Sequence, residues 1–344
     1  MPRRLMPCHA LSATVRRAAR RWAALGTVAM LSGVATAQSF PDPGFSWTSV
    51  GDAGNRGLNQ TEAPFLWERP NTGTVNYNYR MTTTEVTNAQ YIEFVRAFKP
   101  FKEGSLNDVN YTGRWIGYQS GIDDFTVSDS LLHAPATTSW HYAARMLNWM
   151  HNGKVNEKWA FETGVYDTST FGRDPETNNL TDQPVHSPGA KYWLPTLDEW
   201  TKAMYWDPDK NDGEGGYWTY PHGSDEVPLS GLPEDGGETN SGTNALLAVG
   251  SYADVTSPWG FLDGSGGDSE WLETLSFGWA ARMQKGSSYA TALSSIDNFT
   301  VNRVGNGFPQ FASASFRIVT QIPAPPSVFG LVAAAMLVSR RRRV

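Results

Sequence analysis

The distribution of cysteine constrains this chain more than any other sequence feature. Its 344 residues contain one cysteine, Cys8, which lies in a basic N-terminal segment. The rest of the chain therefore has no disulfide, no thiolate nucleophile and no cysteine metal ligand. Such a chain must be held together by its apolar core, as one large domain or two modest ones. Its 14 tryptophans suit a core of this kind, because each supplies a large, rigid apolar surface.

The N-terminus predicts export. Residues 1–21 contain six arginines and no acid, and an apolar run from Trp22 to Ala35 follows. An A-x-A sequence ends at Ala37, so residues 1–37 read as a secretory signal peptide. The apolar run is shorter than the roughly 20 residues that a spanning helix needs. A cytoplasmic amphipathic arm is the alternative interpretation.

The C-terminus predicts a sorting tail over residues 322–344. A proline-rich hinge precedes an apolar run from Val328 to Val338, and four arginines follow. That run would make about 16 Å of helix, against a hydrocarbon core of about 30 Å. The layout resembles the bacterial PEP-CTERM tail, with Pro-Ala-Pro-Pro where that motif has Pro-Glu-Pro. We therefore expect a transient membrane contact through the tail and its sorting machinery, and a location in the cell envelope or extracellular matrix.

The charge of the body argues against nucleic acid as a partner, and none is expected. Of the 28 Lys and Arg residues, six lie in the predicted leader and four in the tail, which leaves 18 in the body. All 34 Asp and Glu residues lie in that body, so its formal net charge is −16. An acidic surface of this kind repels phosphate backbones. It suits an exported protein or one that handles cations.

Three segments show helical periodicity. Residues 84–98 offer Thr87 as N-cap, residues 138–154 end at Asn152-Gly153, and residues 194–208 start at a Pro-Thr pair. Short strands are predicted at 192–194, 246–253 and 315–319. Glycine and proline are spread throughout, so the pattern predicts an α+β fold with much irregular structure.

Six motifs follow one another in the order of a known family. They are EVTNAQY (85–91), TTSWHYAARMLNWMHNGK (137–154), YWLPTLDEW (192–200), GGYWTYPHGSD (215–225), LAVGSYADVTSPWGFLDGSGGDSEWLE (247–273), and KGSSY with SFRIV (285–289 and 315–319). Together they resemble the formylglycine-generating enzyme, or sulfatase-modifying factor, family. The resemblance implies one domain over residues 38–321, with that family's variant of the C-type lectin fold.

The resemblance does not extend to the family's oxidase chemistry. Members that oxidise a cysteine of a target sulfatase use their own cysteine thiolates, with bound copper, near the C-terminal end of the domain. Residues 286–319 offer serines and threonines there instead. Because a hydroxyl cannot replace a soft thiolate as a Cu(I) ligand, neither copper binding nor oxidase activity is expected.

Other catalytic patterns are weak. Some relatives use histidine-ligated iron, but the histidines after residue 37 have no ligand spacing; they are His133, His141, His151, His186 and His222. His186 and His222 could meet only through folding, and hydrogen-bonded or surface roles are expected. No GxSxG sequence occurs. Asp198 and Glu199 diverge by about 100° on a helix, so we expect a helix cap and a buried Glu–Arg contact rather than an acid/base pair.

The acidic stretch WGFLDGSGGDSEWLE (259–273) is a possible calcium loop. Its spacing is not that of an EF-hand. In the family, the matching turn binds calcium through an Asn, carbonyl oxygens and a Glu. By resemblance Glu270 matches the Glu, Gly267 replaces the Asn, and Asp268 falls at a carbonyl donor. A second family site maps to Asn244 with carbonyls near Ala245, Gly250 and Tyr252. A metal-free turn, with Glu270 as a buried hydrogen-bond acceptor, is the alternative.

These observations predict an exported, non-catalytic binding module. Its expected partner is an extracellular polysaccharide or a surface protein, with exposed aromatic side chains as the platform. One alternative is an enzyme of the same family with a cysteine-free site. The other is a purely structural envelope protein. An enzyme would show converging His, Asp or Glu side chains in one polar pocket, and a binding module would show a shallow aromatic face.

Overall fold

The computed structural model describes residues 44–60, 62–63, 71–276, 278, 280–291, 297–298 and 305–322. The predicted signal peptide (residues 1–37) and all of the predicted sorting tail (residues 322–344) except Ile322 lie outside the described residues. Both therefore stay predictions. Within the described part of the chain, no helix has the length and apolar character needed to cross a bilayer.

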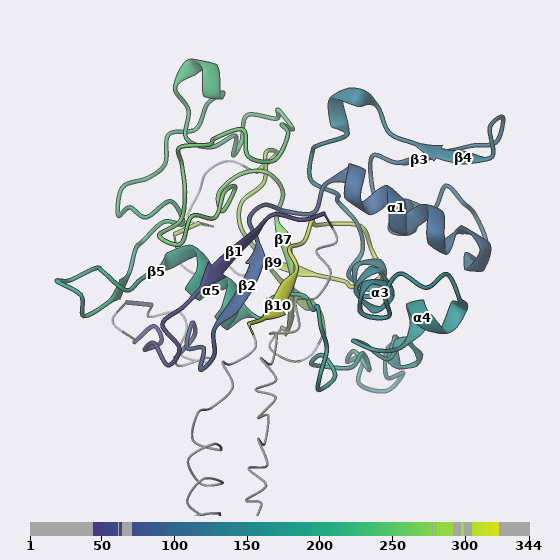
Figure 1. Ribbon diagram of the computed structural model, residues 1–344, viewed down its shortest axis with the longest axis horizontal. Coiled ribbons are helices and arrows are strands. Elements are labelled where there is room, and N and C mark those ends of the chain that lie inside the picture. Colours follow the sequence, from purple (N-terminus) through teal and green to yellow (C-terminus); the bar gives the residue numbers. More distant parts are fainter. Residues whose placement is uncertain are drawn as a thin grey trace, which may run out of the picture. The chain divides into compact units, whose positions relative to one another are not determined.

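Two three-stranded antiparallel sheets organise the domain. The first has the order β1 (Trp47–Val50), β2 (Tyr79–Thr82) and β10 (Val319–Gln321), which lie side by side in Figure 1. The second has the order β7 (Glu270–Leu275), β8 (Arg282–Lys285) and β9 (Gly305–Gly307). Two hairpins complete the strands, β3 (Gly117–Gln119) with β4 (Asp124–Thr126) and β5 (Trp206–Asp207) with β6 (Gly216–Tyr217).

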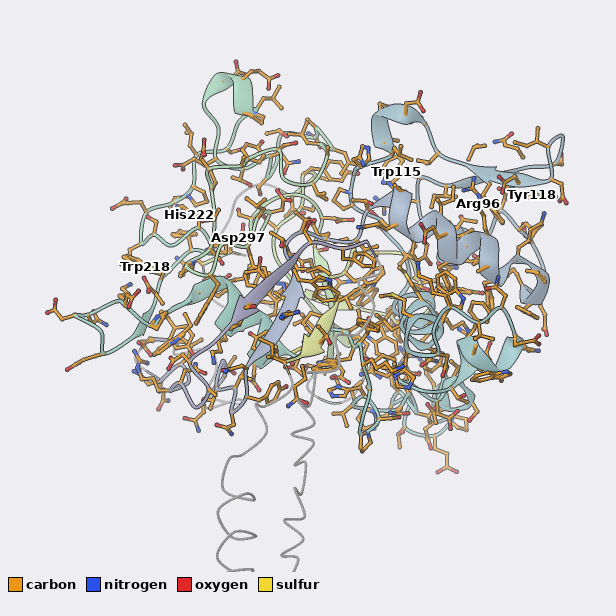
Figure 2. All side chains as sticks on the ribbon, in the orientation of Figure 1. Arg96, Trp115, Tyr118, Trp218, His222 and Asp297 are labelled. Carbon is orange, nitrogen blue, oxygen red and sulfur yellow. The ribbon has the colours of Figure 1, made fainter. Side chains whose placement is uncertain are left out.

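The first predicted helix is confirmed as α1 (Asn88–Phe98). The Thr87 hydroxyl accepts a hydrogen bond from the Gln90 amide, and the Gln90 side chain accepts one from the Thr87 amide. This reciprocal capping box satisfies two amides that a helix start leaves free. Apolar residues at helical spacing then bury one face against the core. Arg96, labelled in Figure 2, lies on the outer face and donates two hydrogen bonds to Asp124 of the neighbouring hairpin.

The other two predicted helices are also confirmed. Helix α3 (Trp140–His151) starts at the N-cap Ser139 and ends where Gly153 adopts a φ of +73°. Helix α5 (Leu197–Tyr205) starts with a second capping box, formed by Thr196 and Glu199. Local capping residues therefore set the bounds of both helices.

Several short elements were not predicted. They are α2 (Val109–Thr112), α4 (Lys158–Glu162) and four 3₁₀ turns, η2 (Lys99–Phe101), η3 (Asp129–Leu131), η4 (Thr168–Thr170) and η5 (Pro233–Asp235). Elements of three to five residues are too short to show a helical period. Helix α4 packs against α3 and α3 against α1, so these three helices form one group (Figure 1).

The three segments predicted as strands do not form strands with the predicted bounds. Residues 246–253 form turns, because the Gly250 amide bonds the Asp263 carboxylate and the Val249 amide bonds the His133 carbonyl. Residues 192–194 make one isolated bridge, from Trp193 to Val319. The predicted strand at 315–319 is wrong in its bounds, since β10 begins only at Val319. Where the backbone amides of 246–253 bond to loop residues, they cannot also form the hydrogen-bond ladder of a sheet.

Buried tryptophans join the helices to the second sheet. The side chains of Trp140, Trp200 and Trp271 are completely buried. Their indole nitrogens donate to the carbonyl of Leu272, the carboxylate of Glu270 and the carbonyl of Thr138, at 3.0, 2.9 and 2.8 Å. Because each buried donor has a partner, these rings add apolar burial without the cost of an unsatisfied polar group.

Candidate functional site: the acidic loop and a surface cleft

Glu270 of the acidic loop is a buried ion-pair partner. It opens strand β7 and is 1 % exposed. Both of its oxygens accept the Nε hydrogen of Arg317 at 3.0 Å, and Oε2 also accepts the Trp200 indole at 2.9 Å. Of the two roles predicted for Glu270, this geometry matches the buried hydrogen-bond acceptor.

Arg317 gathers the loop around one buried guanidinium. Its Nη1 donates to the Thr83 carbonyl and its Nη2 to the Leu262 carbonyl, both at 2.6 Å. Its Nη2 also lies 4.0 Å from the Glu85 carboxylate. Burial and the nearby Asp263 carboxylate raise the pKa of Glu85 well above its usual value. Burial likewise raises the pKa of Glu270 and of Asp263. The Arg317 guanidinium thus interacts electrostatically with three carboxyl groups, those of Glu85, Asp263 and Glu270.

By resemblance Gly267 stands at the asparagine ligand of the family, and a side chain there would require Glu85 to move. The φ of Gly267 is +61°, and a Cβ there would lie 2.4 Å from Glu85 Oε1. Next to it, Asp268 accepts the Thr137 hydroxyl at 2.6 Å and the Ser269 amide at 2.9 Å. Burial raises the pKa of Asp268 to about 6, against the lowering effect of those hydrogen bonds.

The second predicted calcium set lies in the 244–252 turns. The Asn244 amide donates to the Tyr289 carbonyl, and the Ala245 carbonyl accepts the Asn240 side chain at 2.8 Å. Gly250 donates its amide to Asp263, and the Tyr252 hydroxyl donates to the Gly231 carbonyl at 2.7 Å. The Ala245 carbonyl thus already has a protein donor.

These side chains do not fit a calcium ion in the arrangement that the structure shows. The carboxylates of Glu270 and Asp268 already accept hydrogen bonds from protein donors, and Gly267 supplies no side-chain oxygen. Calcium needs six to eight oxygens at about 2.4 Å. Among the described residues, no group of three or more His, Cys, Asp or Glu is placed to hold a metal ion. Calcium binding is untested, and the hydrogen bonds of these residues favour the metal-free turn, the alternative that the sequence left open.

The histidines have separate structural partners. His141 Nε2 lies 3.0 Å from Asp182, and its ring stacks on Phe171 at 4.2 Å. His151 Nδ1 accepts the Lys191 amide. His222, labelled in Figure 2, lies near Tyr220, whereas His186 bonds Glu273 and stacks on Trp193 at 4.4 Å. His141, His151 and His186 thus make the hydrogen bonds expected of them, and His133 is exposed, whereas the buried Nδ1 of His222 has no hydrogen-bond partner among the described residues.

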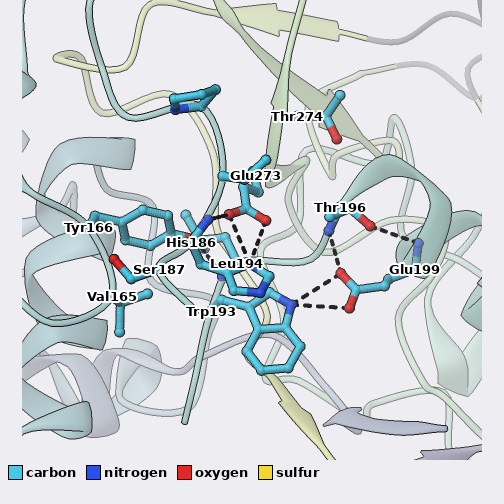
Figure 3. A network of polar contacts seen from close by, with 12 residues as sticks. Val165, Tyr166, His186, Ser187, Trp193, Leu194, Thr196, Glu199, Glu273 and Thr274 are labelled. Atoms are coloured by element: carbon cyan, nitrogen blue, oxygen red, sulfur yellow. Dashed lines mark hydrogen bonds and ion pairs between the residues drawn. The ribbon is translucent and has the colours of Figure 1, made fainter. Parts of the chain in front are cut away.

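A polar network surrounds Glu273 and Glu199 (Figure 3). Glu273 Oε2 lies 2.9 Å from His186 Nδ1, and Glu199 accepts the Trp193 indole at 3.1 Å. The expected Glu–Arg contact at Glu199 is wrong, since its other partners are Tyr77 and the Thr196 cap. Asp198 points elsewhere and accepts the Gly73 amide, so the adjacent acids do not converge. Glu273 also borders a mostly apolar cavity of about 300 Å³.

Hydroxyl groups occupy the segment where family oxidases carry cysteines. The Ser288 and Thr291 hydroxyls bond each other at 2.8 Å. The buried Asp297 (Figure 2) accepts the Ser287 amide and the Ser265 hydroxyl, each at 2.7 Å. The Ser288 and Thr291 hydroxyls and the Asp297 carboxylate therefore have hydrogen-bond partners within the protein, as groups with a structural role do.

A surface cleft of about 520 Å³ opens where α1, α3 and α4 meet. Phe98, Phe101 and Tyr142 give it an aromatic lining. Phe98 lies 6.3 Å from Phe101 and 5.8 Å from Tyr142, centroid to centroid, so the three rings form one cluster. Burial raises the pKa of Tyr142 to about 12, which keeps its hydroxyl a neutral hydrogen-bond donor.

Paired charges line the wall of this cleft. Arg145 of α3 donates from two nitrogens to the two oxygens of Glu162 in α4, at 3.3 and 3.4 Å. The guanidinium also lies 5.3 Å from the centre of the Tyr142 ring. At the mouth, Lys158 and Glu103 form a loose ion pair at 3.8 Å, with exposed fractions of 63 % and 91 %. The cleft thus offers fixed donors and acceptors beside aromatic rings.

Further aromatic side chains lie beyond the lining of the cleft. Arg145 lies 5.2 Å from the Phe171 ring, which stacks on His141. The His141 amide donates to the Pro309 carbonyl, between Phe308 and Phe311. Each of these two phenylalanines is 52 % exposed. The sequence did not identify these two exposed residues, and a role of exposed aromatic side chains in binding stays a prediction.

A comparison with models of protein families identifies the family of the chain. A model of the family described as sulfatase-modifying factor enzyme 1-like domain matches residues 34–322. No curated protein matches the chain in sequence. A solved structure described as the crystal structure of CarF is 22 % identical, with a TM-score of 0.49, over 81 % of this chain and 99 % of that chain. The chain therefore belongs to the sulfatase-modifying factor family and has that family's variant of the C-type lectin fold.

Proposed function

We propose that this protein is an exported, non-catalytic member of its family that binds an extracellular polymer. The observation that carries the proposal is the cleft between α1, α3 and α4. It combines an aromatic lining with preformed donors and acceptors on an exposed face. Its volume of about 520 Å³ falls in the range of roughly 300–1,000 Å³ that is usual for ligand sites.

The chemistry of the chain argues against oxidase activity. Cys8 is the only cysteine, and it precedes the family domain, which starts at residue 34. The hydroxyl pair of Ser288 and Thr291 cannot supply the soft ligands that Cu(I) requires. A serine or threonine nucleophile would also need an adjacent general base. Each of these two hydroxyls instead has the other as a hydrogen-bond partner.

Export and envelope attachment form part of the proposal. They rest on the basic and apolar N-terminal segment that ends at Ala37, and on the apolar and basic tail after residue 322. A protein retained at the envelope by its tail would present the cleft to the surrounding matrix. Polysaccharides and surface proteins are the partners found there.

One observation favours an enzyme instead. Glu273 is 1 % exposed, borders a cavity of about 300 Å³ and lies 2.9 Å from the His186 ring. A histidine oriented by a buried carboxylate is a recurring base in enzymes. However, the cavity is mostly apolar, and His186 does not border it. We therefore place the enzyme second.

Two assays on the purified full chain test the proposal. Retention on a panel of insoluble polysaccharides and immobilised envelope proteins would support binding. Oxidation of a cysteine in a sulfatase-type peptide, followed by mass spectrometry, would reveal turnover. Binding without turnover is the expected result. Turnover, or the absence of retention by every polymer, would overturn the proposal.

A further inference from the structure

The charge of the cleft between α1, α3 and α4 bears on which extracellular polymers can bind there. Its ionisable lining comprises two basic side chains, Arg145 and Lys158, and three acidic ones, Glu103, Glu162 and Asp167. The formal charge of the lining is therefore −1. The body around it carries a formal charge of −16, so the field at the cleft repels polyanions.

We propose that this cleft binds a neutral glycan chain. The inference rests on the proposed function and names its ligand class and its site. A pyranose ring has an apolar C–H face and a rim of hydroxyl groups that both donate and accept hydrogen bonds. The cleft matches both parts, because aromatic rings lie beside side chains that can accept and donate.

The aromatic part of the match comes from Phe101 and Tyr142. Both are half-buried, whereas Phe98 beneath them is 4 % exposed. Each ring is held by its neighbours, since Phe101 packs on Phe161 and Tyr142 on Tyr111 at 5.6 and 5.3 Å. Rigid rings lose little conformational entropy when a ligand covers them.

The polar part of the match comes from Arg145 and Glu162. Their paired contacts fix a planar donor group beside a planar acceptor group. The Thr168 hydroxyl donates to the same Glu162 carboxylate, which holds it further. A guanidinium has five N–H donors and a carboxylate about four lone-pair sites, so both keep capacity for sugar hydroxyls.

The mouth of the cleft can admit a chain. Lys158 and Glu103 are mostly exposed, and an ion pair of this kind contributes at most about 1 kcal/mol, so a ligand can part it and hydrogen-bond both side chains. The cleft is framed by helices and 3₁₀ turns, from α1 and η2 to α4 and η4. These offer no strand edge along which an extended peptide could add.

The test compares variants of the full chain by affinity electrophoresis in gels that contain one soluble polysaccharide each. Dextran, mannan and laminarin serve as neutral probes, and alginate and hyaluronate as anionic ones. Arg145→Met removes the planar donor but keeps much of the apolar stem. We expect its affinity for the retained neutral polymer to fall by about tenfold or more, since a hydrogen bond to a charged group is lost.

Arg96→Met is the matched control. Arg96 also bonds a carboxylate through two nitrogens, to Asp124 at 3.0 Å each, but it lies outside the cleft. Its substitution should leave retention unchanged. The double variant Glu103→Ala/Lys158→Ala changes only exposed side chains and should weaken retention without affecting folding, which thermal unfolding checks.

The outcomes separate the site, the ligand class and the proposed function. Retention by a neutral polymer, weakened by Arg145→Met and the double variant but not by Arg96→Met, supports the inference. Retention that neither cleft variant changes overturns the site and leaves the proposed function standing. Preference for alginate or hyaluronate, or for an immobilised envelope protein, overturns the ligand class. Wild-type protein that no polymer or envelope protein retains overturns both the inference and the proposed function.

Discussion

The Nε of Arg317 lies 3.0 Å from both carboxylate oxygens of Glu270, and neither side chain is more than 1 % exposed to solvent. The pair joins the acidic loop to the chain segment just before β10. Because the same guanidinium also binds the carbonyls of Thr83 and Leu262, it connects three distant segments. The guanidinium therefore holds the acidic loop against the segments around Thr83 and Arg317.

Removing one partner of this pair should destabilise the protein strongly. Glu270→Gln leaves Arg317 charged and buried without its nearest counter-ion, and breaking a buried pair typically costs about 3–5 kcal/mol. The free energy of unfolding in urea measures the change. Glu62→Gln is the control, because its pair with Arg56 is partly exposed and should contribute less than about 1 kcal/mol. Equal losses in the two variants would contradict the structure.

Asp268 should make the stability depend on pH. Burial raises its pKa to about 6, so the folded state binds the proton more tightly than the unfolded chain. The resulting stabilisation is complete below the unfolded pKa of about 3.8 and is lost as the pH rises to about 6. A shift of about two units corresponds to roughly 3 kcal/mol.

Asp268→Asn isolates this effect. The amide keeps an oxygen for the Ser269 amide and can donate to the Thr137 hydroxyl, so the hydrogen bonds persist without a buried charge. We expect the variant to be more stable than the wild type at pH 8, and the difference to shrink towards pH 4. Urea titrations at both pH values measure it. A wild type that stays more stable at both pH values would show that Asp268 ionises without a penalty.

Calcium should leave the stability unchanged. Glu270 and Asp268 already accept hydrogen bonds from the protein, and Gly267 cannot carry a ligand without moving Glu85. Thermal unfolding of the full chain with calcium and with excess EDTA tests this expectation. A bound ion at 100 times its Kd would add about 2.7 kcal/mol, which is easily measured. A calcium-dependent rise in Tm that disappears in Asp268→Asn would establish the family site instead.

The elements that the sequence predicted well depend on local chemistry. Thr87 and Thr196 begin helices because each hydroxyl reaches an amide three residues later. The strands were harder, because pairing joins residues far apart in sequence. Val319 finds Met81 in β2 and Trp193 in a single bridge, and no local pattern encodes either partner.

The cleft could not be predicted for the same reason. Tyr142 and Arg145 lie three residues apart on α3, which places them on one face, and this spacing was the available signal. Glu162 lies in α4, whose five residues show no helical period. Glu270 was predicted to be either a ligand or a hydrogen-bond acceptor. The acceptor role depends on Arg317, which only the fold brings to Glu270, and calcium ligation stays a prediction.

His186 should give the stability a pH dependence in the neutral range. Burial lowers its pKa less than the hydrogen bond and charge of Glu273 raise it, so the folded ring holds its proton above the ordinary pKa of about 6.5. This stabilisation is complete below the unfolded pKa and is lost as the pH rises through the folded pKa. His186→Phe keeps an aromatic ring to stack on Trp193 but cannot titrate. Its urea midpoint should therefore fall less between pH 6 and pH 9 than that of the wild type.

His141→Asn is the control of opposite sign, because burial lowers the pKa of His141 despite the nearby Asp182. Its loss should remove a destabilisation that sets in as the pH falls below about 6.5. A His186→Phe profile parallel to that of the wild type would show that the contact with Glu273 does not hold the proton.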